Sequence, residues 1–324
     1  MPWLVRDVVR DINKAAGRRW QAVDPLLPVP RDLPAGCADP FQVTDARTGR
    51  ATGFAVCRHQ YYPAESLLQT WGAATQFVLT PRLRERDTYP ALDDLLAQWH
   101  DHLKAIQDAH SEDTAALVTW PSRDVSGVRA LLRHGLQPMT VLAARPAARA
   151  AAVAGTRQDK SLTIRQAGPE DERAVVEMEM GVIRFDEQFG GAVPRPATED
   201  LIRQNTRLTL ARARTWTWLA EKGGTPVGLL VVQPPADSTW VAAMTATAPA
   251  AYLATMFVNP AERGAGIATA LASTAHEELD QAGVAVTVLH HSQVNPVSGP
   301  FWNRMGYRPL WTSWETRPAA TLRP

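Results

Sequence analysis

A short stretch of sequence occurs twice in this chain of 324 residues. The first copy, RHGLQP, runs from Arg133 to Pro138, and the second, RMGYRP, from Arg304 to Pro309. A VSG triplet precedes each copy, and the separation is 171 residues at the glycines and 172 at the triplets. Such constant spacing favours a duplicated fold, and the length agrees, since a single core usually contains about 100–200 residues.

The second half of the chain shows the fuller pattern of predicted elements. Helical segments are indicated by a favourable first turn or by apolar residues at helical spacing, and strands by short apolar runs. The predicted order is strand 161–165, helix 168–180, a helix from Thr198, a hairpin around Gly223-Gly224, strand 252–258, a helix from Ile267, strand 284–289, a further helix and a last strand.

The first half repeats the later part of this order, with a hairpin in 41–59, a strand at 75–80, a helix at 91–106 and a buried strand at 115–120. We therefore predict an α/β (α+β) protein of two tandem domains, each a mixed central sheet flanked by helices. The small-residue stretch Ala143 to Lys160 has the character of a linker. We place the first domain at 1–145, the linker at 146–160 and the second domain at 161–324.

Composition excludes several classes of function. The formal net charge is +1, and interspersed acidic and basic residues produce no field for nucleic acid. The cysteines, Cys37 and Cys57, are too few for a disulfide framework and wrongly spaced for zinc, so we expect no metal. No signal peptide and no run of about 20 apolar residues is evident, which predicts a cytoplasmic protein without a membrane partner.

A glycine-rich turn, VNPAERGAGIATAL, lies between a predicted strand and a predicted helix, at residues 258–271. Glycines allow a sharp turn with inward N–H groups, and a helix start adds positive potential, so the turn suits a pyrophosphate. A plain tight connection is the simplest alternative. Dinucleotide binding is excluded, because the turn follows a late strand and no acidic ribose partner lies at the expected distance.

The turn resembles the coenzyme A motif of the GNAT family of N-acetyltransferases, which has the pattern Arg/Gln-x-x-Gly-x-Gly/Ala. A second segment, from Asn295 to Tyr307, is similar to another motif of the family, N-x-x-A-x-x-φ-Y-x-x-x-G-F/Y. The resemblance covers the second half and implies acetyl-CoA as co-substrate. Two tandem domains are also similar to mycothiol synthase, although no motif fixes a thiol precursor as acceptor. The residues that the resemblance assigns to the cofactor are Met256, Phe257, Val258, Arg263, Gly264, Ala265, Gly266, Ile267, Ala268, Thr269, Asn295 and Trp302. Asn295 precedes Pro296 and could equally be a turn residue.

The first half has no such turn, because residues 80–94 contain no glycine. Arg82, Arg84 and Arg86 could meet an anion there, but a solvated charged turn is the preferred interpretation. We therefore expect the first domain to be a degenerate copy of the fold without cofactor.

Proton transfer is less well defined by the sequence. The tyrosine that often protonates the departing thiolate in the family is replaced by Trp302, whose indole is no general acid at neutral pH. Tyr252 occupies the place where some members of the family have a glutamate base, but its reference pKa of about 10 makes it a poor base unless that pKa is shifted. An aromatic packing residue at the start of a strand is the preferred interpretation of Tyr252. His290 and His291 end the strand, and one of them is the preferred base, with a hydrogen-bonded structural role as the alternative for either.

The expected function is acetyl-CoA-dependent N-acetylation of a small-molecule amine by a monomer or homodimer. Acidic residues of the first two helices would attract a cationic amine, although a solvated helix face explains most of them; the charged residues there are Glu177, Glu179, Arg184, Asp186 and Glu187. Transfer to oxygen or sulfur, transfer of a longer acyl group, and coenzyme A binding without turnover are alternatives.

Overall fold

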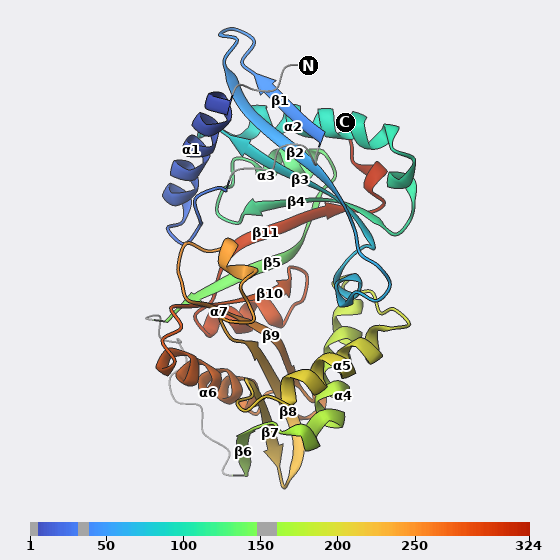
Figure 1. Cartoon of the computed structure of the whole chain (residues 1–324), viewed down its shortest axis with the longest axis vertical. Coiled ribbons are helices and arrows are strands. Elements are labelled where there is room, and N and C mark those ends of the chain that lie inside the picture. The colour runs from blue at the N-terminus through green and yellow to red at the C-terminus, as the bar shows by residue number, and fades with distance from the viewer. Residues whose placement is uncertain (1–5, 32–38, 148–160) are drawn as a thin grey trace. The chain divides into compact units, whose positions relative to one another are not determined.

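A computed structural model describes residues 6–31, 39–147 and 161–324 (Figure 1). The contacts divide the chain into two compact units. The first unit contains the chain up to Pro63, Ala73–Val141 and Pro309–Pro324, and the second contains Ala64–Gly72 and Leu142–Arg308. Cys37 and most of the expected linker lie outside the described residues. None of the described helices is long and apolar enough to cross a membrane.

The second unit is built on a mixed sheet in the order β5-β10-β9-β8-β7-β6. These strands are β5 (Gln137–Pro146, of which the end lies here), β6 (Leu162–Gln166), β7 (Thr217–Lys222), β8 (Thr225–Gln233), β9 (Ala250–Val258) and β10 (Val286–Ser292). Strands β9 and β10 are parallel, whereas β6 to β9 pair antiparallel. Helices α4 (Glu172–Glu187) and α5 (Thr198–Leu210) lie on one side of the strands, and α6 (Ile267–Gln281) on the other (Figure 1).

Burial of apolar side chains fixes these helices on the sheet. Val175 and Met178 of α4 pack with Leu219 of β7 and Leu229 of β8 in one core cluster. The short helix α7 (Ser298–Arg304) follows β10. The predicted elements of the second half are thereby confirmed, with β10 reaching Ser292, three residues further than expected.

The first unit has the strand order β1-β2-β3-β4-β11. Its strands are β1 (Asp39–Thr44), β2 (Ala51–Tyr61), β3 (Thr75–Leu83), β4 (Thr114–Pro121) and β11 (Arg308–Thr316), and its helices are α1 (Arg6–Val23), α2 (Tyr89–Ala105) and α3 (Val128–Arg133). Helix α2 contributes Leu92, Leu95 and Trp99 to a core that includes Phe77 of β3. Helix α1 was not predicted from the sequence.

The last strand of the chain lies in the first unit, where β11 pairs antiparallel with β4. The end of β5, in contrast, lies in the second unit and borders β10. The sequence predicted that each half would keep its own last strand, so the structure differs by an exchange of strands. Ala143 to Arg145 belong to β5, so these residues are strand and not linker.

The repeated motif has the same local structure in both copies. Gly135 and Gly306 follow the short helices α3 and α7 and have φ angles of 80° and 91°. Glycine suits this left-handed conformation because it has no Cβ. The repeat therefore marks an equivalent turn between a short helix and a strand, as a duplication predicts.

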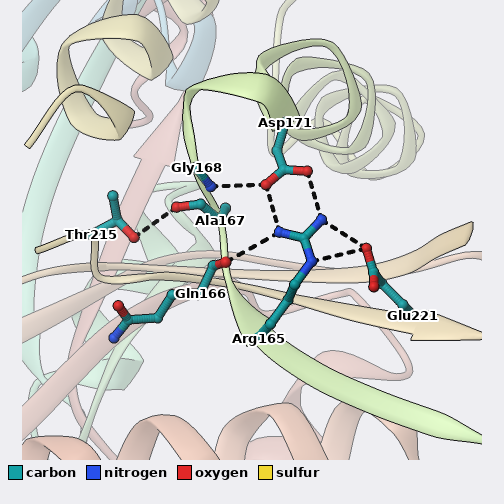
Figure 2. A network of polar contacts seen from close by, with 7 residues as sticks. All are labelled: Arg165, Gln166, Ala167, Gly168, Asp171, Thr215 and Glu221. Carbon is teal, nitrogen blue, oxygen red and sulfur yellow. Dashed lines mark hydrogen bonds and ion pairs between the residues drawn. The ribbon is translucent and has the colours of Figure 1, made fainter. Parts of the chain in front are cut away.

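A network around Arg165 ties β6 to its neighbours (Figure 2). The guanidinium donates to both oxygens of Asp171, over 2.7 and 2.8 Å, and to Glu221 Oε1 over 2.7 Å. Asp171 Oδ2 also accepts from the Gly168 N–H at 2.8 Å. Hydrogen bonds from Arg165 hold the pKa of Asp171 below its usual range. The network fixes the first turn before α4 to the edge of the sheet.

We expect an Asp171→Asn variant to lose about 1–3 kcal/mol of unfolding free energy at neutral pH, because Arg165 loses its charged partner. Since the pKa of Asp171 is lower in the folded state, its contribution is complete above the unfolded pKa of about 3.9 and is lost as the pH falls through the folded value. Urea unfolding at several pH values measures the difference. Asp200→Asn, at an exposed position of α5, is the control, and an equal loss in both variants would contradict the assignment.

Candidate active site

The glycine turn lies at the start of α6, as predicted. Gly264 and Gly266 have φ angles of 85° and 81°, and no other atom lies within 4 Å of the position of a Cβ on Gly264. The first hydrogen bond of α6 runs from Ala270 N to Gly266 O. The N–H groups of Ile267 to Thr269 therefore belong to the first turn, where a helix offers donors to an anion.

Strands β9 and β10 separate beside this turn. Their parallel pairing runs from Ala250 and Val286 to Leu253 and Leu289, and β9 then continues to Val258 without a β10 partner. Ala254 forms a bulge, since Val231 and Val232 of β8 face Thr255 and Leu253. The backbone edge of Met256 to Val258 is thus open toward β10. An extended amide-containing chain fits such an edge, and the turn fits its phosphates, so the residues suit acyl-coenzyme A.

Arg263 extends from the turn over α4. Its guanidinium lies 4.9 Å from the centre of the Phe185 ring, and its Nε donates to the carbonyl oxygen of Val258 at 3.3 Å. The side chain is exposed. A positive charge at this position complements a phosphate group.

Three aromatic side chains gather where β9 and β10 begin to part. Tyr252 Oη and His290 Nδ1 are 3.1 Å apart, and the ring of Trp240, which precedes the short helix Val241–Ala243, lies 4.9 Å from that of Tyr252. The rings of Trp240 and His290 are nearly parallel, with centroids 6.1 Å apart. Trp240 is 49% exposed. The cluster thus presents an accessible aromatic surface.

The protonation of this cluster follows from its surroundings. Shielding from water raises the pKa of Tyr252 to about 12, so the phenol keeps its proton at neutral pH. The same shielding, together with nearby His291, lowers the pKa of His290, although part of its side chain stays exposed. Tyr252 is therefore suited to donate a proton, and His290 is neutral. In the tautomer that has no proton on Nδ1, His290 accepts from Tyr252 Oη, and its Nδ1 lone pair is then occupied.

The other predicted site residues occupy different surroundings. His291 Nδ1 lies 3.1 Å from the Ser292 carbonyl oxygen, and partial burial lowers the pKa of this histidine. Asn295 Oδ1 accepts from the N–H groups of Val297 and Ser298, and Asn295 Nδ2 donates to Asp186 Oδ1 at 3.2 Å. Asn295 thus forms the turn into α7, as its position before proline suggested.

Trp302 is buried in α7 and packs edge-on against Phe301 and Tyr307, with centroids 4.8 and 5.1 Å away. The position therefore contributes packing around the end of β10. Its contact with the cofactor stays a prediction.

Glu179 is the residue whose position the sequence interpretation missed. It lies on α4 toward β9, where Oε1 accepts from Thr255 Oγ1 at 3.2 Å and Oε2 from Thr206 Oγ1 of α5 at 3.4 Å. Glu179 follows Val175 by four residues, so helical spacing puts it on the buried side of α4. That spacing was the available signal. Glu177 and Glu187 are exposed, in agreement with a solvated helix face.

The corresponding strands of the first unit are filled by side chains. Parallel pairing of β3 and β4 ends at Leu79 and Val118, and Arg82, further along β3, is buried with its guanidinium 4.9 Å from the centre of the Trp20 ring. Arg19 forms a buried ion pair with Asp124 close by. The expectation of a solvated turn is therefore wrong for Arg82, which lies inside a strand, whereas Arg86 is exposed.

No group of three or more potential metal ligands occurs among the residues that the structure describes.

Residues 184–307 match the model of the acetyltransferase (GNAT) family. A GCN5-related N-acetyltransferase from Sphaerobacter thermophilus has a similar fold, with a TM-score of 0.52 and 18% identity over 91% of this chain and 84% of that one. A search of curated protein sequences found no match.

Two further structures match with lower TM-scores. A tandem GNAT protein from the clavulanic acid biosynthesis pathway is 13% identical over 97% of this chain and 96% of that one, with a TM-score of 0.46. A GCN5-related N-acetyltransferase from Ralstonia eutropha JMP134 is 25% identical over 46% of this chain and 93% of that one, with a TM-score of 0.35. The family match begins in the last turn of α4, ends just beyond α7 and includes the glycine turn, and it identifies residues 184–307 as a domain of the acetyltransferase (GNAT) family.

Proposed function

We propose that the protein is an acetyl-CoA-dependent N-acetyltransferase that acts on a small-molecule amine. The observation that carries this proposal is the parting of β9 from β10 after Leu253, directly beside polar and aromatic side chains. A thioester held along the β9 edge would meet an acceptor at this point. In the first unit, Arg82 is buried beyond the paired part of β3 and lies against Trp20, which supports a first domain without cofactor. We also propose that the enzyme is cytoplasmic.

The chain's own residues divide into two groups in this proposal. Arg263 to Thr269 hold the phosphates, and the backbone of Met256 to Val258 binds the pantetheine arm. Asn295 and Trp302 lie on the segment that follows β10. Acetyl-CoA supplies an activated acetyl thioester. Tyr252, His290 and His291 are the proposed proton-transfer residues, and the pKa of about 12 puts Tyr252 on the donating side.

Thiol release from acetyl-CoA with a panel of amines tests the proposal, with mass spectrometry of the product. We expect turnover that depends on an amine and an acetamide product. An ester or thioester product would assign transfer to oxygen or sulfur. Binding of coenzyme A without turnover of any acceptor would instead indicate a coenzyme A-binding protein that is not an enzyme.

A further inference from the structure

Glu179 is held at two points on the side of the sheet that α4 and α5 cover. Thr255 of β9 and Thr206 of α5 each donate to a different carboxylate oxygen, over 3.2 and 3.4 Å. Gly181 allows α4 to lie this close to β9, since a Cβ there would be 2.6 Å from Cε2 of Phe257. The carboxylate is therefore positioned by three elements and still has part of its surface accessible.

The carboxylate lies beside the parted strands. Thr255 is the second residue after Leu253, the last residue of β9 that pairs with β10. It also directly follows the bulge at Ala254. A group bonded to the Thr255 side chain is thus adjacent to the strand segment that would carry the thioester.

Few charges compete for this carboxylate. The arginines of α5 that face α4 are engaged elsewhere, Arg203 with Glu199 at 2.5 Å and Arg207 with Glu172 at 2.8 Å. On α4 itself, Asp186 bonds to Asn295, and Glu177 is exposed. Of the titratable groups on β9 and β10, Tyr252 and His290 bond to each other, and His291 Nδ1 lies 3.1 Å from the Ser292 carbonyl oxygen. Glu179 lacks a counter-ion among the described residues, and shielding from water raises its pKa to about 7.

We propose that Glu179 is the group that takes the proton from the acceptor amine. An ammonium acceptor would donate one N–H proton to Glu179, and the freed nitrogen lone pair would attack the thioester carbonyl carbon. The C–N bond forms and the C–S bond breaks, and the second proton that the nitrogen loses as it becomes an amide passes to the departing thiolate, which gives coenzyme A. This inference rests on the proposed function and assigns an amine that is cationic in solution as the acceptor class.

The chemistry favours Glu179 over the imidazoles for this step. An efficient base has a pKa close to the working pH, which the surroundings of Glu179 provide and those of His290 do not. A carboxylate also attracts the cationic acceptor before it removes the proton. Tyr252 and His290 then remain available for the departing sulfur.

The test compares pH profiles of kcat/KM for the amine in the full-length protein. In the wild type the rate should rise with pH through an ionisation near the pKa of Glu179. Glu179→Gln keeps the shape and the threonine bonds but removes the basic oxygen, so we expect a loss of about 10²–10⁴-fold and no such ionisation. Glu277→Gln, at an exposed position of α6, is the matched control and should keep both.

A second variant gives a readout that a purely structural role would not move. Thr255→Val removes a hydrogen bond that stabilises the charged carboxylate, so the ionisation should shift to higher pH while the rate at high pH is largely kept. Thermal midpoints and coenzyme A affinity, unchanged in both variants, would exclude a general loss of folding.

The outcomes separate this inference from the proposed function. Acetamide formation with an unchanged pH profile in Glu179→Gln and Thr255→Val would overturn the role of Glu179 and leave the N-acetyltransferase intact. Loss of the ionisation in His290→Gln but not in Glu179→Gln would also overturn it. A product acetylated on oxygen or sulfur, or no turnover with any amine, would contradict the proposed function and the inference together.

Discussion

A fragment of residues 161–324 expressed alone should be insoluble or unfolded, although it contains the whole family match. It lacks the end of β5, which borders β10, and with it Arg145, whose bidentate ion pair with Asp280 ties β5 to α6. It also lacks the segment Ala64–Gly72. In this segment the carbonyl oxygen of Thr70 accepts from the Val193 N–H, and Thr70 Oγ1 bonds to Thr198 Oγ1. Strand β11 would lose β4 and expose Trp311 and Trp314.

The size of this effect follows from apolar burial. Each large apolar side chain that becomes exposed costs about 1.5–3 kcal/mol, and a domain is stable by only about 5–15 kcal/mol. Circular dichroism and denaturant unfolding of the purified fragment measure the loss. Co-expression of residues 1–160 and 161–324 as two chains is the control, because it restores every missing strand. A fragment that is soluble and fully active by itself would show that the exchanged strands are dispensable.

Gly266→Glu should abolish coenzyme A binding in the measurable range. A carboxylate at this position would lie in the space expected for phosphate, where two like charges about 4 Å apart repel by about 4 kcal/mol at an effective dielectric constant of about 20. This corresponds to a dissociation constant about 10²–10³ times larger. Calorimetric titration measures it, and the wild type should bind one molecule per chain.

Gly283→Glu is the matched control for this variant. Gly283 follows the opposite end of α6 and has a φ angle of 75°, so the backbone strain of the substitution is comparable. We expect this variant to bind coenzyme A as the wild type does. Wild-type affinity in Gly266→Glu, or two equivalent sites per chain, would mean that the phosphate site is misassigned.

Much of the fold and the glycine turn before α6 could be predicted because local sequence determines them. The glycines at 264 and 266 require a left-handed backbone that glycine adopts readily, and the apolar period from Ile267 places α6 directly after them. The repeat around Gly135 and Gly306 likewise identifies equivalent turns. These features depend on residues that are close in sequence, so a short sequence motif is enough to predict them.

The tertiary structure alone decided which sheet receives each last strand and which acidic side chain of α4 bonds to Thr255 of β9. Strands β5 and β11 follow the same repeated turn, so their local patterns are alike, and their exchange depends on packing between distant residues. Glu179 and Glu177 are two residues apart on one helix. Helical spacing from Val175 puts Glu179 on the buried side of α4, but only the tertiary structure shows its contacts with Thr206 and Thr255, which are 27 and 76 residues away in sequence.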